Sequence, residues 1–236
     1  MSNLFAPNPL VGDVDTILEA MENRQPAVAS HCRRVSAYGV QLAVQYGLPD
    51  DMVEAIRVGG LLHDVGKLMV PTDILSKPGR LTEQEWHALQ GHPEYGFDMA
   101  EQLGFESAVL DIILYHHERN DSSGYPDGLD GRTIPWTVRI VSVMDAFDAL
   151  TSPRAYRAAL SVEAAQALLA REAADRYCPW AVSGLMSMPK PVLDAVAHGE
   201  ADRYRPETAP SALVVEAATA RWIPSYHEDP RIVTAW

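Results

Sequence analysis

The sequence predicts an all-α protein. Apolar residues recur at steps of three and four over several segments, and helix-start and helix-stop signals separate these segments. No stretch shows the alternation of apolar and polar residues that would demand a sheet, and no internal repeat or low-complexity segment is present. Hydrophobic residues make up 47% and charged residues 22% of the 236 residues, which is typical of a globular protein.

The first third of the chain contains three predicted helices. Residues 1–12 are rich in Pro and Asn, so we expect an irregular N-terminal segment. A helix is expected over 13–24, because Val14, Ile17, Leu18 and Met21 fall on one face. Two more are expected over 27–46 and 51–63, separated by a Gly-Leu-Pro-Asp stop signal.

The remaining elements follow from caps and turns. A loop is expected over 71–80, and Thr82 with Glu85 forms a capping box that starts a helix reaching His92. Pro93 suits the first turn of a helix that ends near residue 104. Further helices are predicted over 108–117, 138–150, 162–176 and 189–198, with a long loop over 119–135. We expect one domain over 13–200 and a proline-rich tail over 201–236 packed on it.

Charge and composition exclude several classes of function. The formal charge is −13, and an acidic chain is a poor binder of nucleic acid polymers, whose affinity comes from neutralised phosphates. A small anionic substrate requires metal ions or clustered basic residues that reverse the local field. No apolar run approaches the roughly 18 residues of a membrane span, and the N-terminus lacks the features of a signal peptide. We therefore expect a cytoplasmic protein, with Cys32 and Cys178 as buried thiols rather than a disulfide.

One stretch carries the strongest chemical signal. In residues 61–67 (LLHDVGK), an imidazole and a carboxylate are adjacent and a lysine follows three residues later. Asp64 can bridge two cations while His63 gives a nitrogen to one of them. The other ligands must come from elsewhere, and candidates at or near predicted helix ends are His31, His92, His116, His117 and Asp145. Histidine and carboxylate without thiolate suit iron, manganese, zinc or nickel.

The ordered motifs resemble the HD-GYP domain, a branch of the HD phosphohydrolase superfamily. The resemblance covers roughly residues 13–198 and is carried by HDVGK at 63–67, HHER at 116–119, GYP at 124–126, KPGRLT at 77–82, HPEYG at 92–96, DAFDALTS at 145–152 and RAYR at 154–157. It implies an all-helical bundle with a binuclear metal site. It also implies a phosphodiesterase that opens cyclic di-GMP to pGpG, which members of the family often cut further to GMP.

The resemblance also implies roles for individual residues. One metal would take His31, His63, Asp64 and Asp145, and the other would take Asp64, His92, His116 and His117. A hydroxide between two divalent ions, iron or manganese, would be the nucleophile. Catalytic roles fall to Asp64 and Lys67, and substrate contacts to Lys67, Tyr125, Asp148, Arg154 and Arg157. For the two arginines, a salt bridge to an acid such as Asp148 is an equal alternative. Asp148 itself is expected either to hydrogen-bond a ligand or to hold Arg154.

Three departures from the family pattern refine these expectations. Ala27 stands where some members carry a glutamate that helps to bind a third metal, so we predict two metals. Ser122 replaces a glycine of the usual D-G-S-G-Y-P motif, which affects substrate fit more than metal binding. Gly59 and Gly60 are more flexible than the residues usual before the His-Asp pair, and the sequence alone does not explain them.

Three alternatives remain open from the sequence. The substrate is another cyclic dinucleotide such as 3′,3′-cGAMP or another phosphoester; the centre performs oxygenase chemistry; or the fold is a non-catalytic module that senses a cyclic dinucleotide. Lys67 and the GYP loop argue against oxygenase chemistry, and the complete set of seven ligands argues against a degenerate module. A homodimer or a regulatory protein partner is also expected, because the chain leaves no room for an attached sensor domain.

Overall fold

The computed structural model describes residues 10–153 and 158–199, and within them the prediction of an all-α protein is confirmed. The strand-like pairing in these ranges is limited to two isolated bridges, Asp121 with Asp130 and Ala173 with Tyr177. The elements are α1 (Leu10–Arg24), α2 (Pro26–Gln45), α3 (Asp50–Leu62), the 3-10 helix η1 (Val65–Met69), α4 (Thr72–Leu75), α5 (Glu83–Gln90), α6 (His92–Gln102), α7 (Ser107–Tyr115), α8 (Trp136–Thr151), α9 (Val162–Glu172), α10 (Pro179–Ser187) and α11 (Lys190–Ala197).

Most helix boundaries lie within two residues of the prediction, but two helix ends differ by more and three short elements were not predicted. Helix α1 begins at Leu10, three residues before the predicted start, and it therefore includes Gly12, which costs only about 1 kcal/mol relative to alanine. The expected loop over 71–80 contains the single turn α4. Helix α9 ends four residues early, where Ala174 takes a left-handed φ of 75°. Neither η1 nor α10 was predicted, although Pro179 suits a first helical turn. The predicted C-terminal tail lies outside the described residues.

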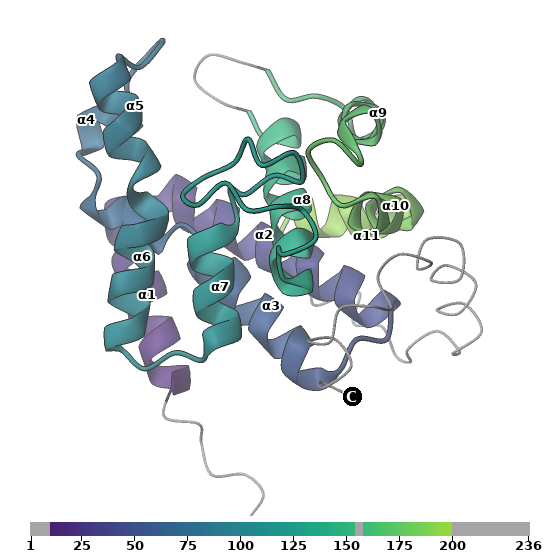
Figure 1. Cartoon of the computed structure of the whole chain (residues 1–236), viewed down its shortest axis with the longest axis horizontal. Coiled ribbons are helices and arrows are strands. Elements are labelled where there is room, and N and C mark those ends of the chain that lie inside the picture. The colour runs from purple at the N-terminus through teal and green to yellow at the C-terminus, as the bar shows by residue number, and fades with distance from the viewer. Residues whose placement is uncertain (1–9, 154–157, 200–236) are drawn as a thin grey trace, which may run out of the picture.

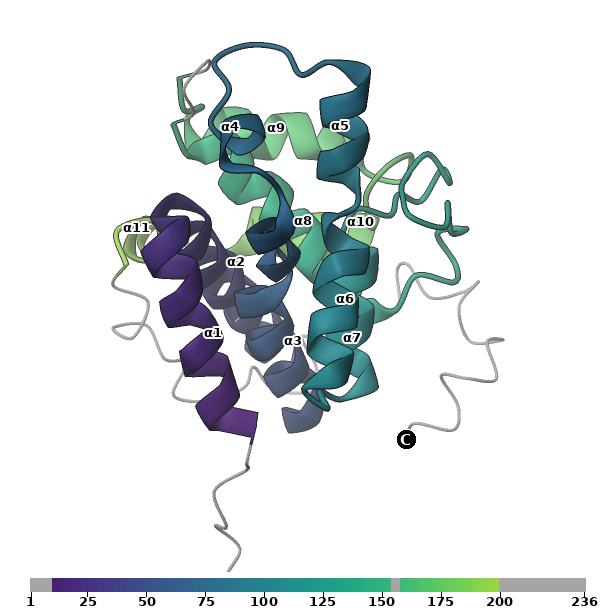
Figure 2. The same cartoon turned by 90° about the vertical axis from the view of Figure 1, so that its left-hand side faces the viewer.

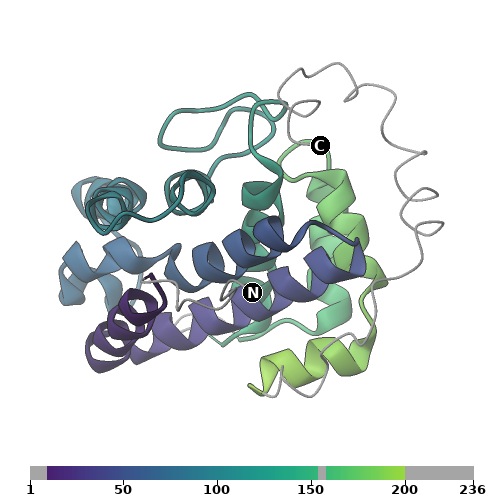
Figure 3. The same ribbon diagram turned by 90° about the horizontal axis from the view of Figure 1, so that it is seen from below.

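Helices α2 and α3 form the centre of the fold. They run side by side (Figure 3), with α8 packed across both. Helices α1, α6 and α7 lie on one side of this centre, and α9, α10 and α11 lie on the other (Figure 1). The pair α4 and α5 extends beyond α6 at the top of the molecule (Figure 2). No helix among the described residues is both long enough and apolar enough to cross a bilayer.

Two clusters of buried side chains stabilise this arrangement. The first surrounds α8 and includes Tyr38 and Phe147, whose rings meet edge to face with centroids 5.3 Å apart. The second lies between α1, α3, α6 and α7 and includes Met21 and Leu62. Each such side chain contributes about 1.5–3 kcal/mol when it is fully buried. Neighbouring residues of α7, Ile112 and Ile113, belong to different clusters, so the clusters meet just before the end of α7.

The structure explains the glycine pair before the His-Asp motif. A Cβ atom at Gly60 would lie 2.7 Å from the Cα atom of Ser36 on α2. A Cβ atom at Gly59 would lie 2.6 Å from the side chain of Ile112 on α7. The two glycines therefore let α3 approach both neighbours closely, directly before it delivers His63 and Asp64. The predicted buried, free cysteines are confirmed at Cys32 and Cys178.

Candidate metal centre

The ends of three helices and the sides of two others converge on one site. His63 and Asp64 follow α3, His92 is the first residue of α6, and His116 and His117 follow α7. His31 and Asp145 lie inside α2 and α8, not at or near helix ends as predicted. They still face the site, because the sides of α2 and α8 pack around the end of α3.

Tight backbone packing fixes the position of Asp64 relative to α6. A Cβ atom at Gly66 in η1 would overlap the carbonyl oxygen of His92, and it would lie 2.5 Å from the amide nitrogen of Gly96. Only glycine therefore fits where η1 crosses the start of α6. This close crossing brings the carboxylate of Asp64 within reach of the His92 imidazole.

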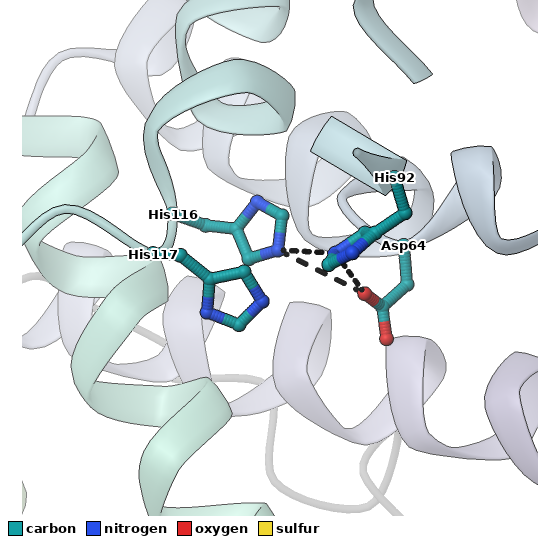
Figure 4. Close-up of side chains that lie close together, drawn as sticks. All are labelled: Asp64, His92, His116 and His117. Atoms are coloured by element: carbon teal, nitrogen blue, oxygen red, sulfur yellow. Dashed lines mark hydrogen bonds and ion pairs between the residues drawn. The ribbon is translucent and has the colours of Figure 1, made fainter. Parts of the chain in front are cut away.

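The first donor group comprises Asp64, His92, His116 and His117 (Figure 4), with one ligand atom of each residue within 4.8 Å of the others. Asp64 Oδ1 lies 3.1 Å from His92 Nε2 and 3.8 Å from His116 Nε2. The two imidazole Nε2 atoms are 3.2 Å apart. Several lone pairs thus point at one small volume, which is the arrangement that a cation stabilises.

The second donor group shares Asp64 with the first. It comprises His31, His63 and Asp64. Asp64 Oδ2 lies 3.6 Å from His63 Nε2 and 3.9 Å from His31 Nε2. Asp145 joins the group through His31, whose Nε2 is 3.1 Å from Asp145 Oδ1. Because each oxygen of Asp64 faces a different group, its carboxylate is placed to bridge two cations.

Backbone carbonyls orient three of the histidines. The Nδ1 atom of each donates to the carbonyl oxygen three residues earlier, at 2.7–2.9 Å: Gly60 for His63, Leu89 for His92 and Ile113 for His116. These bonds place the proton on Nδ1 and leave the Nε2 lone pair free to bind a metal.

Burial and neighbouring charges favour the ligand forms of three of these groups, His116, His117 and Asp64. His63 Nε2 and Asp64 Oδ1 are buried without a hydrogen-bond partner, which is costly unless a cation satisfies them. Burial lowers the pKa of His116 and of His117 well below the usual value, so both imidazoles are neutral. Burial raises the pKa of Asp64, but Lys67, His63 and His92 together outweigh burial and hold this pKa well below its usual range. Neutral imidazoles and an ionised carboxylate are the forms that bind a divalent cation, so the residues present fit such an ion.

Two predicted substrate contacts border the cluster. Lys67 Nζ donates to Asp64 Oδ2 at 2.5 Å, and the Lys67 carbonyl accepts from Gln25 Nε2 at 2.8 Å. The ring of Tyr125 stacks on the His117 imidazole, with centroids 4.7 Å apart and an interplanar angle of 29°. Burial raises the pKa of Tyr125, so its hydroxyl remains protonated and can donate a hydrogen bond.

A buried glutamate that was not singled out in the sequence anchors the GYP loop. Glu118 is 2% exposed, and its Oε1 accepts from the amides of Asp127 and Gly128 at 2.8 and 3.0 Å. Its Oε2 accepts from the amide of Leu129 at 2.9 Å. This carboxylate therefore holds the segment that follows Tyr125. The available signal was an acidic residue directly after the histidine pair, at the start of a loop rich in glycine.

Ser122 lies in the left-handed region, with φ of 60°. This is the position where the family pattern has glycine, which adopts such a φ without strain. The serine hydroxyl donates to the carbonyl of Leu129 at 3.3 Å, and the serine amide donates to the carbonyl of Arg119 at 3.0 Å. The replacement is thus accommodated with local strain and a partly compensating hydrogen bond.

Asp148 is placed differently from the prediction. It is 1% exposed, and protein donors engage both of its oxygens: Arg34 Nε reaches Oδ1, and His31 Nδ1 reaches Oδ2 at 2.7 Å. This burial argues against the predicted contact with substrate. Sequence reasoning also missed Arg34, which carries no signal beyond its place three residues after His31. Arg154 and Arg157 lie outside the described residues, so their predicted roles stay predictions.

A family model, several curated proteins and several solved structures each match a large part of this chain. A sequence model of the HD domain matches residues 15–179. Cyclic di-GMP phosphodiesterase response regulator RpfG of Xanthomonas campestris pv. campestris is 39% identical over 172 residues, which cover 72% of this chain and 46% of that protein. Cyclic di-GMP phosphodiesterase PA4108 of Pseudomonas aeruginosa is 44% identical over 128 residues, which cover 54% of this chain and 31% of that protein. The chain thus spans less than half the length of these curated relatives.

Other relatives carry a different substrate in their names. 3′3′-cGAMP-specific phosphodiesterase 2 of Vibrio cholerae is 39% identical over 146 residues, which cover 61% of this chain and 28% of that protein. Among solved structures, the cyclic GMP-AMP specific phosphodiesterase V-cGAP3 of V. cholerae matches with a TM-score of 0.59 and 18% identity over 88% of this chain and 57% of that chain. At this identity the structural match shows the shared fold alone.

Proposed function

We propose, from the premise that this chain belongs to the HD domain family, that it is a metal-dependent phosphodiesterase acting on a cyclic dinucleotide, with cyclic di-GMP as first choice. The observation that best supports this proposal is the position of Asp64 between two donor groups. His63 Nε2 and Asp64 Oδ1 are also buried there without a hydrogen-bond partner. The names of the relatives that cover most of this chain support the substrate class.

We assign two divalent cations, iron or manganese, to the two donor groups. The proposed ligands of one are His31, His63, Asp64 and Asp145, and those of the other are Asp64, His92, His116 and His117. When bound, such cations polarise phosphoryl oxygens and lower the pKa of water. Two divalent charges against the carboxylates of Asp64 and Asp145 leave a net charge of about +2. This local field allows a chain of net charge −13 to bind an anion.

The chain's own residues position the substrate. Lys67 lies beside Asp64 and can direct its ammonium to a non-bridging phosphate oxygen as a point charge. Tyr125 presents an aromatic ring at the edge of the cluster, where it can stack on a base. Glu118 holds the loop that carries this ring. We retain as proposals the contacts of Arg154 and Arg157, a cytoplasmic location, and a homodimer or regulatory protein as partner.

A second candidate substrate, 3′,3′-cGAMP, is favoured by two observations. Ser122 adds a side chain and a left-handed φ to the loop that carries Tyr125, and several relatives are named 3′3′-cGAMP-specific phosphodiesterases. The change acts on the fit of the base rather than on the metal ligands. Either substrate requires the same cations and the same Asp64.

A substrate panel tests the proposal. Protein loaded with Mn²⁺ or Fe²⁺ is incubated with cyclic di-GMP, 3′,3′-cGAMP and a linear dinucleotide, and the products are separated by chromatography. We expect pGpG or GMP from cyclic di-GMP, and no product from an Asp64→Asn variant. Absence of cleavage of every cyclic dinucleotide by fully metal-loaded protein would overturn the proposal, and tight binding without cleavage would identify a sensing module instead.

A further inference from the structure

His31 is oriented by a different kind of partner from that of the other histidines. His63, His92 and His116 donate from Nδ1 to backbone carbonyls. His31 Nδ1 instead donates to a carboxylate, Asp148 Oδ2, at 2.7 Å. A carboxylate partner makes the opposite nitrogen of the ring a stronger electron donor than a neutral carbonyl does. His31 Nε2 is the atom that faces Asp145, at 3.1 Å.

A second side chain of α2 fixes Asp148 in turn. Arg34 forms a two-pronged contact with it, from Nε to Oδ1 at 2.6 Å and from Nη2 to Oδ2 at 2.9 Å. Arg34 Nη2 also donates to Ser152 Oγ at 3.1 Å, and Nη1 donates to Ser30 Oγ at 2.8 Å. The guanidinium fork thus sets the plane of the carboxylate, and the carboxylate sets the plane of the His31 ring.

Arg34 also provides the burial site of Asp148 with hydrogen-bond donors. Asp148 is almost fully buried, and Arg34 donates to both of its oxygens. The same carboxylate accepts from His31 Nδ1 through Oδ2. The contact joins residues 114 positions apart and connects α2 to α8, the two helices that supply His31 and Asp145.

The two proposed cation sites therefore differ in their supporting contacts. The site with His31 has a carboxylate of its own, Asp145, and a histidine backed by a second carboxylate, Asp148. The other site has only the shared carboxylate of Asp64. Its histidines His92 and His116 donate from Nδ1 to backbone carbonyls, not to carboxylates. The first environment is the more electron-rich.

We propose that Arg34 and Asp148 are positioning residues that make the His31 site the tighter of the two cation sites. This inference rests on the proposed two-cation centre and deepens it. Neither residue is assigned a contact with substrate or cation. Loss of the contact lets the His31 ring rotate and weakens its donor nitrogen, so the effect appears first in cation affinity.

The test is a Mn²⁺ titration of metal-free protein against a competing chelator. Wild-type protein should bind two ions in two steps. Asp148→Asn and Arg34→Met should weaken the tighter step by 10–100-fold, the usual effect of losing such a supporting contact, and should leave the weaker step within about twofold. Arg34→Lys keeps the charge without the fork and should fall between wild type and Arg34→Met.

Arg33→Met is the matched control, because Arg33 is the adjacent arginine on α2 and forms an exposed pair with Glu22. It should leave both steps unchanged. The unfolding temperature of each metal-free variant shows whether the contact between Arg34 and Asp148 stabilises the packing of α2 on α8 independently of cation binding. If Asp148→Asn does not fold, Arg34→Met and Arg34→Lys decide the question.

Unchanged affinities in variants with lowered unfolding temperatures would overturn the inference and leave a purely structural brace. A selective loss of the weaker step would overturn it as well. Fewer than two ions bound by wild-type protein would overturn the proposed centre itself, which distinguishes the two failures.

Discussion

Replacement of Glu118 by glutamine should detach the GYP loop from its anchor. Glutamine offers one acceptor oxygen where glutamate offers two. In the more favourable orientation, the glutamine oxygen still accepts from the amides of Asp127 and Gly128. The glutamine NH2 group then faces the N–H of Leu129, and two donors cannot bond to each other. An unsatisfied N–H costs up to about 1–3 kcal/mol, and the amide of Leu129 is partly buried. Loss of the charge removes roughly half of the about 1.5–3 kcal/mol that each of the other two bonds contributes, so the anchor loses about 2.5–6 kcal/mol in all.

A loss of this size should open the loop locally rather than unfold the domain. The Tyr125 ring then leaves its position on His117, and the stacking that it offers a base, worth about 1–3 kcal/mol, is weakened. At about 1.4 kcal/mol per tenfold, kcat/KM for the cyclic dinucleotide should fall by about 10-fold or more, mainly through KM. Metal content should stay at the wild-type value, because Glu118 belongs to neither donor group.

Steady-state kinetics and metal analysis on the same preparations test this prediction. Asp130→Asn is the control, because it makes the same carboxylate-to-amide change in the same loop at an exposed residue that accepts from a backbone amide. The control should retain wild-type kinetics to within about twofold. A Glu118→Gln variant with the same KM and kcat/KM as the control would refute the proposed role of Glu118 in anchoring the loop.

Three further predictions concern stability. Gly60→Ala should lower the free energy of unfolding by about 1–3 kcal/mol in urea denaturation, because the added methyl meets the backbone of Ser36; an unchanged midpoint would contradict the close helix contact. Ser122→Gly should raise the free energy of unfolding by up to about 1 kcal/mol through relief of the left-handed φ, and a clear decrease would show that the serine hydroxyl dominates. Burial lowers the pKa of His31, but its two carboxylate partners outweigh burial and raise the pKa to about 9. Because the folded pKa exceeds the usual 6.5, this stabilisation of metal-free protein is complete below pH 6.5 and is lost as pH rises through about 9; a free energy of unfolding that increases over this range would contradict the assignment.

Much of the helical framework could be predicted from local signals. The capping box at Thr82 is present, with both reciprocal hydrogen bonds, and it sets the start of α5 at the next residue. The stop signal after α2 and Pro93 in α6 likewise gave boundaries within two residues. Short elements such as η1 and α4 were not predicted, because a single turn has no periodicity to detect. Helix α10 combines proline, glycine and only nine residues, which together hide its pattern.

Six of the seven candidate ligands were predictable because each belongs to a short ordered motif, and His31 was identified through the family resemblance. The structure brings all seven side chains to one place, although His31 and Asp145 come from the sides of helices. The supporting contacts were not predictable, because Arg34 meets Asp148 only through the packing of α2 on α8. The same reason applies to Gly60, because the requirement for glycine follows from the close approach of α2, which the sequence does not show.

Metal content and turnover measured on the same sample test the central claim most directly. Protein purified without chelator should contain two divalent ions per chain and cleave a cyclic dinucleotide, whereas Asp64→Asn should lose ions from both donor groups together with activity. A variant that retains two ions, or wild-type protein that cleaves the substrate at full rate with one ion or none, would contradict the shared role of this carboxylate.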